Sequence, residues 1–354
     1  MKKTAAIFSP KYYEHNPGKD HPESPNRLQA IINELENSEL AQNRNWQFVP
    51  PEKARIEDVE LVHSREYIKL VEAVCKAGGG FLDLEDTVVS PQSYEVALYA
   101  VGGTLKAVDL VMNNTFRNAF ALIRPPGHHA SKFRACGFCL FNNASIAAEY
   151  LLEKYRLQRI LILDIDAHHG NGTQETFYET DNILYISLHE DPSSFPGTGF
   201  ADEIGEGKGL GYTVNVPLPF GTSDQTYLKA MREIAVPIIR QYKPQFILVS
   251  SGFDGHHTDP VGNLSLSASC YKEIYKIIID LASETCENRL VAVLEGGYSV
   301  KCIGKLAASS LAQMCGTSFS TRDRIPRIEK RSIIIGEKVI KDVKKVQKSY
   351  WNLD

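Results

Sequence analysis

The stretch RILILDIDAHHGNG, residues 159–172, decides the expected fold. Positions 160–163 are all apolar, so a strand formed there would be buried on both faces. Such strands are typical of parallel sheets that carry helices on each side. Aspartate, histidine and glycine follow directly, at the strand end where open α/β sheets bind their ligands.

Apolar runs and segments of helical period alternate along most of the chain. Strands are predicted at 4–8, 119–123, 159–165, 183–188, 212–216, 246–250 and 290–294. Helices are predicted at 25–36, 64–77, 93–112, 143–155, 224–241, 267–283 and 300–314. The fold class is therefore α/β, a single domain with an open, mostly parallel sheet, helices on both faces and the site at the carboxyl ends of the strands.

The domain organisation follows from the absence of an internal linker. No stretch rich in proline, glycine or serine precedes residue 315, so residues 1–315 are expected to form one domain. Residues 316–354 follow as a C-terminal extension. Its lysines recur at helical spacing around Ile340 and Val343, which predicts a basic amphipathic helix packed on the same domain.

Composition excludes several classes of function. The 354 residues are 43% hydrophobic and 23% charged with a net charge of −4, which is typical of a globular protein and favours neither nucleic acid nor an acidic membrane surface as a partner. No apolar run reaches the ~18 residues of a membrane span, and the run after the first three residues is too short for a signal peptide. Seven scattered cysteines favour a reducing, cytoplasmic location. Self-association into a homo-oligomer stays open.

A candidate metal site is formed by Asp166, His168 and Asp254. Alternate side chains share a face of a strand, so Asp164, Asp166 and His168 would point the same way. Crowded buried carboxylates need a cation or hydrogen bonds to compensate their repulsion. Asp254, at the end of a second strand, adds a third ligand, and two aspartates with one histidine leave open positions for water and substrate, as a catalytic zinc ion requires.

Two adjacent histidines, His128 and His129, follow a stiff Pro-Pro-Gly turn. One can move a proton for water on the metal, while the other stays an electrostatic partner. A histidine held by Asp164 would be more basic than one held by the neutral Asn171, and this difference would divide the two roles.

Tyr298 follows a predicted strand and two glycines, a turn that can bring its phenol into the site. There it could donate a hydrogen bond to the oxyanion that forms when water attacks an amide carbonyl. The alternative, a half-buried anchor with its hydroxyl in water, stays open in a chain with 16 tyrosines.

Other candidate residues are given no chemical role. His169, and the neighbours His256 and His257, are expected to make local hydrogen bonds or to face water. Cys136 and Cys139 have the spacing of a redox pair, but no thioredoxin-like pattern surrounds them, so packing is expected.

These motifs together resemble those of the zinc-dependent histone deacetylase superfamily, which includes acetylpolyamine amidohydrolases and bacterial deacetylases. The similarity runs from about residue 10 to about residue 315. It rests on HPESPNRL (21–28), RPPGHHA (124–130), GFCLFNNASIAA (137–148), DIDAHHGNGTQETFY (164–178), FPGTG (195–199), GFDGHHTDPVGNLSL (252–266) and LEGGYS (294–299). Their common order and spacing make the resemblance highly specific.

The resemblance implies a bacterial class II-like deacetylase that hydrolyses acetyl-lysine or another acylated amine to acetate and free amine. The implied roles are one zinc ion held by Asp166, His168 and Asp254, the general base and acid His129, the electrostatic partner His128 paired with Asp164, and the carbonyl-polarising Tyr298. Asn171 and the DPVG segment match the class II pattern.

The resemblance also implies a narrow substrate tunnel between Phe138 and Phe195, beside Gly137. Asp86 matches a position that holds the substrate backbone in many members. Val261 stands where a polyamine-selective class II member has a glutamate, which makes a polyamine substrate less favoured. An acetylpolyamine amidohydrolase and a non-catalytic acyl-lysine-binding protein stay open as alternatives.

Two structural potassium sites are implied by the same resemblance and not by the patterns themselves. The inner site would use Asp164, Asp166, His168, Ser187 and Leu188, and the outer site Phe177, Thr180, Ile183 and Tyr212. A binuclear manganese hydrolase of the arginase type is a further alternative, although no carboxylate stands two positions after His168.

Overall fold

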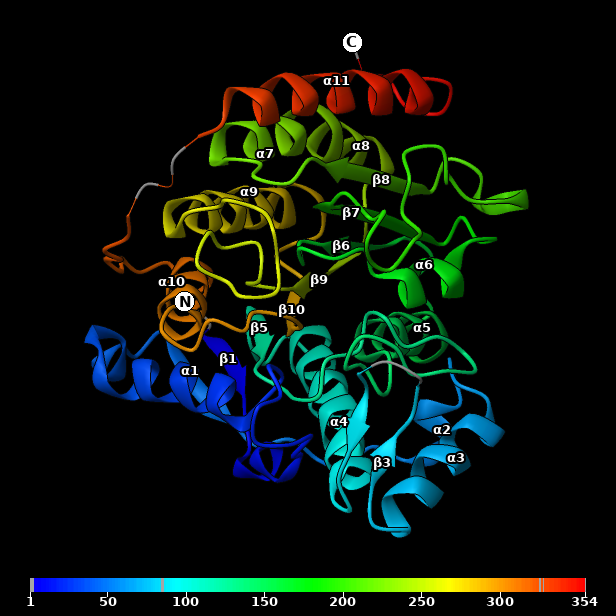
Figure 1. Cartoon of the computed structure of the whole chain (residues 1–354), viewed down its shortest axis with the longest axis vertical. Helices are drawn as coiled ribbons and strands as arrows, with labels where there is room; N and C mark the ends of the chain where they lie inside the picture. The colour runs from blue at the N-terminus through cyan, green and yellow to red at the C-terminus, as the bar shows by residue number, and fades with distance from the viewer. Residues whose placement is uncertain (1–2, 84–85, 325, 327, 354) are drawn as a thin grey trace.

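The centre of the fold is an eight-stranded sheet, seen in a computed structural model that describes residues 3–83, 86–324, 326 and 328–353. The strand order is β2-β1-β5-β10-β9-β6-β7-β8, and every described pair of neighbours is parallel (Figure 1). The strands are β1 (Thr4–Ile7), β2 (Trp46–Val49), β5 (Asn118–Ala121), β6 (Ile160–Asp164), β7 (Ile183–Glu190), β8 (Thr213–Leu218), β9 (Phe246–Ser251) and β10 (Leu290–Leu294). The α/β class with a parallel sheet is thus confirmed.

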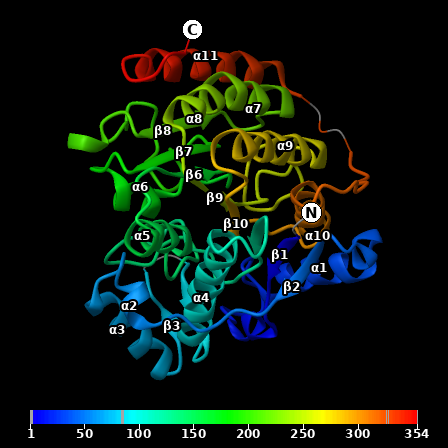
Figure 2. The ribbon, with the colours of Figure 1, turned by 180° about the vertical axis from the view of Figure 1, so that it is seen from behind.

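Helices cover both faces of this sheet, as Figures 1 and 2 show from opposite sides. One layer packs α4 against α5 and α5 against α6, and the other packs α1, α9, α10 and the α7–α8 segment side by side. The helices are α1 (Pro25–Asn37), α2 (Ile56–Val59), α3 (Arg65–Lys76), α4 (Ser93–Met112), α5 (Asn143–Tyr155), α6 (Asn171–Phe177), α7 (Asp224–Ala230), α8 (Val236–Tyr242), α9 (Ala268–Thr285), α10 (Ile303–Met314) and α11 (Lys330–Gln347). None of the described helices is long and apolar enough to span a bilayer.

Two elements differ from the sequence-based expectation. The expected helix at 224–241 is divided into α7 and α8 by a wide π turn at Met231–Ala235, because Pro237 has no N–H to donate to the preceding turn. Strand β2 was not predicted. It is a four-residue edge strand with one buried residue, Trp46, so it lacks the continuous apolar run that marks the central strands.

The register of the sheet brings the motif loops together. Asp164, the last residue of β6, lies opposite Ser187 in β7 and Ser250 in β9. Ser251 in turn lies opposite Leu294, the last residue of β10. The strands therefore end at a common edge, and the loops that follow them form one rim.

Helix α11 lies beside β8, the strand at one edge of the sheet (Figures 1 and 2). The side chains of Ile340 and Val343 are buried there, and Gln347 Nε2 donates a hydrogen bond to the Thr213 carbonyl oxygen at 3.0 Å. This helix covers an edge that would otherwise offer unpaired backbone groups to another chain.

Candidate active site

Asp166, His168 and Asp254 meet at the common edge of the sheet, where one ligand atom of each lies within 4.8 Å of the others. His168 Nδ1 lies 3.0 Å from Asp254 Oδ2 and 3.4 Å from Asp166 Oδ1. All three side chains are buried or nearly so. Two carboxylates and one imidazole that converge in this way are a donor set that zinc accepts.

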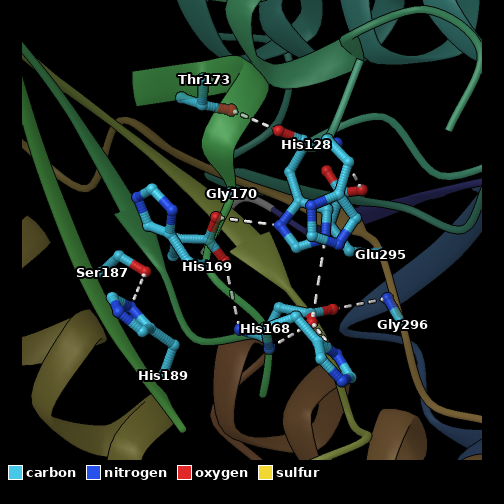
Figure 3. Close-up of polar contacts among 12 residues, drawn as sticks. His128, His168, His169, Gly170, Thr173, Ser187, His189, Glu295 and Gly296 are labelled. Carbon is cyan, nitrogen blue, oxygen red and sulfur yellow. Dashed lines mark hydrogen bonds and ion pairs between the residues drawn. The ribbon is translucent and has the colours of Figure 1, made fainter. Parts of the chain in front are cut away.

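Backbone N–H groups hold the two carboxylates in place. Ala167 N donates to Asp254 Oδ1 at 2.9 Å. Gly296 N donates to Asp166 Oδ2 at 2.8 Å, as the dashed line at Gly296 in Figure 3 shows. Burial raises the pKa of Asp254, and the charge of Asp166 adds to this effect. A bound cation would relieve the repulsion between the two carboxylates, so the protonation behaviour also fits a metal.

The adjacent histidines, in the loop after β5, have different partners. His128 Nδ1 lies 3.1 Å from Asp164 Oδ2, whereas His129 Nδ1 lies 2.7 Å from Asn171 Oδ1. Burial works to lower the pKa of His128, but the charges of Asp166 and Asp164 outweigh it and raise the pKa to about 10. Burial and the charge of His128 lower the pKa of His129 well below its usual value. The pKa values of the two adjacent imidazoles are therefore shifted in opposite directions.

Glu295, which the sequence did not single out, holds the turn that carries both histidines. Its Oε2 accepts hydrogen bonds from Gly127 N at 2.7 Å and His128 N at 3.2 Å. It lies at the end of β10, beside His128 in Figure 3. A carboxylate directly after a strand was the available signal, but its partners lie 168 and 167 residues away in sequence.

Tyr298, His129 and His168 line one cavity of about 270 Å³. Its other described lining residues are Asp86, Gly137, Phe138, Glu190, Ser194, Phe195, Val261 and Asn263. All five residues expected from the resemblance to contact substrate are thus brought together here.

Two aromatic rings form walls of the cavity. The ring centroids of Phe195 and His129 lie 4.9 Å apart, and those of Phe138 and Tyr298 lie 5.6 Å apart. Both pairs are in edge-on contact. Gly137 has a φ of +54°, and a Cβ atom there would come within 2.5 Å of the His129 ring. Only glycine fits at this position.

The loop that carries Tyr298 is fixed from two sides. Asp259 Oδ2 accepts hydrogen bonds from Tyr298 N at 2.6 Å and Ser299 N at 2.9 Å. Arg27 donates to the Gly297 carbonyl oxygen at 2.6 Å, and its guanidinium lies 4.7 Å from the centre of the Tyr298 ring. The tyrosine is therefore held in place. Its side chain is partly buried, and this burial raises its pKa.

Glu190 is a second residue that the sequence analysis missed. Its Oε1 lies 3.8 Å from His168 Nε2, the ring nitrogen on the far side from the two aspartates. Asn263 fixes this carboxylate through its backbone N–H at 2.5 Å and its side-chain amide at 2.9 Å. Glu190 directly follows the SLH segment at the end of β7, but only the fold brings it to His168.

The residues expected for the inner potassium site lie at the end of β6, in the loop that follows it and on the neighbouring strand β7. Asp164 pairs with Ser187, whose hydroxyl lies 2.7 Å from His189 Nδ1 (Figure 3). The Leu188 carbonyl oxygen accepts a hydrogen bond from Tyr227 at 3.3 Å.

The residues expected for the outer site also gather in one region. Phe177 ends α6 and accepts a hydrogen bond from Thr180 N at 3.3 Å. Ile183 is the first residue of β7. Tyr185 N, also in β7, donates a hydrogen bond to the Tyr212 carbonyl oxygen at 2.9 Å.

Comparison with known proteins places the chain in a family. Residues 21–314 match the histone deacetylase domain. The chain is 42% identical over 359 residues to a probable deacetylase of Archaeoglobus fulgidus, with 98% of each chain covered. It is 36% identical over 303 residues to a histone deacetylase-like amidohydrolase of Pseudomonas aeruginosa, covering 86% of this chain and 79% of the relative. A crystal structure of the HDA15 HD domain matches with a TM-score of 0.88 and 31% identity, covering 99% of this chain and 95% of that one.

Together with the fold, these relatives place the chain among hydrolases of the deacetylase type. The chain belongs to the histone deacetylase family.

Proposed function

We propose that the protein is a zinc-dependent deacetylase that hydrolyses an acylated amine, such as acetyl-lysine, to acetate and free amine. One observation supports this most strongly. His168, which meets Asp166 and Asp254, lines the same cavity as His129 and Tyr298, so an acyl group bound there would lie beside all three lining residues. When bound, zinc supplies a Lewis acid for the carbonyl and lowers the pKa of its water towards ~7.

The histidine pair carries the proton transfers in this proposal. The Nδ1 of His129 is engaged by Asn171, so Nε2 is the ring nitrogen that would take a proton from the attacking water. His129 then returns the proton to the leaving amine. His128, held cationic beside Asp164, stabilises the negative charge that develops during the attack.

Tyr298 polarises the acyl carbonyl in this proposal. Its low tendency to ionise keeps the phenol proton available as a hydrogen-bond donor to the oxyanion. The fixed loop around it means that little reorganisation is needed during the reaction.

Phe138, Phe195 and Gly137 would form the narrow passage for the extended acyl-amine chain, and Asp86 would hold the substrate backbone. Val261 lines the same cavity without a charge, which favours lysine over a polyamine.

We further propose that potassium binds at the inner and outer groups of residues described above. We also propose a catalytic unit of residues 1–315, with residues 316–354 as its C-terminal extension.

The roles of His129 and Tyr298 can be tested by substitution. His129→Ala is expected to lower kcat on an acetyl-lysine peptide by about 10²–10⁴-fold, and Tyr298→Phe by about 10²–10³-fold. Zinc content, measured by mass spectrometry of the metal, should be unchanged because neither side chain belongs to the ligand group.

Tyr350→Phe, on an exposed tyrosine, is the control and should retain full activity. Near-normal turnover by both variants would refute the assigned roles. Failure of the wild-type protein to release acetate from acetylated peptides and polyamines would instead favour a non-catalytic acyl-lysine-binding protein.

A further inference from the structure

A second cluster of metal-binding side chains is formed by His256, His257 and Asp323. The two histidines lie in the loop after β9, and Asp323 comes from the segment that joins α10 to α11. His256 Nε2 lies 3.0 Å from Asp323 Oδ2, and His257 Nε2 lies 3.0 Å from Asp323 Oδ1. The sequence indicated only local hydrogen bonds for these histidines, because the aspartate lies 66 residues further along the chain.

The spacing of this cluster matches that of the candidate zinc ligands. There, His168 Nδ1 lies 3.0 Å and 3.4 Å from its two carboxylate partners. In both clusters the ligand atoms lie within 4.8 Å of one another, and in both a histidine nitrogen faces a carboxylate oxygen at 3.0 Å. Such distances suit ligand atoms that share one ion with bonds of about 2.0–2.2 Å.

Neighbouring groups hold the side chains of Asp323 and His256 in fixed orientations, as is common for metal ligands in proteins. Ala268 N donates to Asp323 Oδ2 at 2.8 Å, and Arg324 N donates to Oδ1 at 2.7 Å, so the carboxylate is held by the backbone. His256 Nδ1 lies 2.9 Å from Thr258 Oγ1, which leaves Nε2 as the nitrogen that faces Asp323. A hydrogen bond at the far ring nitrogen is a general feature of histidine ligands.

Partial exposure gives an ion access to the cluster. The side chain of His256 is 2% exposed, whereas those of His257 and Asp323 are 14% and 17% exposed. Two imidazoles and one carboxylate leave a coordination position for water, and this ligand set suits Zn²⁺ among the common divalent ions.

We propose that His256, His257 and Asp323 form a second Zn²⁺ site that joins the C-terminal segment to the loop following Asp254. The same loop carries Asp259, which holds the backbone of Tyr298. The second ion would therefore connect the segment leading to α11 with a loop of the candidate active site, and it does not depend on the proposed function.

The test is to count zinc in the full-length protein. The metal-free protein is loaded with Zn²⁺, desalted and analysed for metal per chain. Two ions are expected for the wild type, one for Asp323→Asn and one for Asp166→Asn. His257→Gln should lose the same ion as Asp323→Asn, whereas Asp342→Asn, on an exposed aspartate of α11, should keep both. Near-ultraviolet circular dichroism checks that each variant is folded.

The outcomes separate this inference from the proposed function. One ion in the wild type and none in Asp166→Asn would overturn the inference and leave His256 and His257 as hydrogen-bond donors to Asp323. Two ions in Asp323→Asn would overturn it as well. If Asp166→Asn keeps the wild-type number while Asp323→Asn loses one, the second site stands and the proposed zinc chemistry fails.

Discussion

Single residues decide how firmly the candidate zinc ligands are held, and Glu190 is the most informative of them. Its carboxylate faces the far ring nitrogen of His168 at 3.8 Å and is kept in place by Asn263. A carboxylate in this position raises the basicity of a histidine ligand and fixes its orientation. Removing the charge should therefore weaken metal binding without removing a ligand.

We expect Glu190→Gln to lower the zinc affinity about 10–100-fold. The measurement is competition for Zn²⁺ with a fluorescent chelator. Glu206→Gln, on an exposed glutamate, is the control and should bind zinc as the wild type does. Equal affinities for the two variants would show that Glu190 has no influence on the metal.

The sequence could indicate which side chains lie close together where each one follows a strand directly. Asp166, His168 and Asp254 could be placed together because parallel strands end at one edge of the sheet. Arg27 and Asp259 could not be found in this way. Both act through the Tyr298 loop, and the contacts that bring them there depend on packing between segments distant in sequence.

At the scale of elements, α11 offers a direct test of how the C-terminal extension is attached. Ile340 is 2% exposed on its inner face, while Ile334 of the same helix is 71% exposed. Ile340→Ala should lower the free energy of unfolding by about 2–5 kcal/mol, because it leaves a cavity against the core. Ile334→Ala should change it by less than about 0.5 kcal/mol.

Urea denaturation followed by circular dichroism measures both variants under the same conditions. If the two substitutions have equal effects, α11 does not pack on the sheet edge in solution. The result also bears on the domain limits, since a loosely attached helix would unfold separately from residues 1–315.

The central strands were predictable because each is a continuous apolar run with polar residues directly after it. Edge strand β2 was not, since three of its four residues are only partly buried or exposed. The division between α7 and α8 was also missed. Apolar periodicity continues through the π turn, and only Pro237 indicates the break.

At the scale of the whole molecule, Glu23 joins the N-terminal segment to the candidate active site. It is buried between Arg27 and Arg124, with hydrogen bonds of 2.8 Å and 2.6 Å to their guanidinium groups. Burial opposes its ionisation, but the charge of Arg124 and hydrogen bonds from His15 and Arg124 hold its pKa well below the usual value. The ionised form is therefore stabilised in the folded state.

Glu23→Gln should lower the free energy of unfolding at pH 7 by about 3–5 kcal/mol, because both arginines lose their buried counter-charge. Since the folded-state pKa of Glu23 is lowered, its contribution is fully present above the unfolded value of ~4.3 and is lost as the pH falls through the folded value. The difference between wild type and variant should therefore shrink on acidification.

Urea denaturation at a series of pH values measures this difference. Glu14→Gln is the control, because it removes only a surface ion pair with Lys11, in which the Glu14 side chain is 45% exposed. It should lower the free energy of unfolding by no more than ~1 kcal/mol. An effect of Glu23→Gln as small as that of Glu14→Gln would mean that the buried network contributes little.

The buried network of Glu23, Arg27 and Arg124 also limits when this protein can acquire its pocket during synthesis. Arg27 reaches the carbonyl groups of Glu295 and Gly297, so the wall beside Tyr298 needs both the start of the chain and a segment near residue 298. A nascent chain cannot close that wall until the segment has left the ribosome. Shorter translation products would contain Glu23 and both arginines but would lack the phenol against which Arg27 packs.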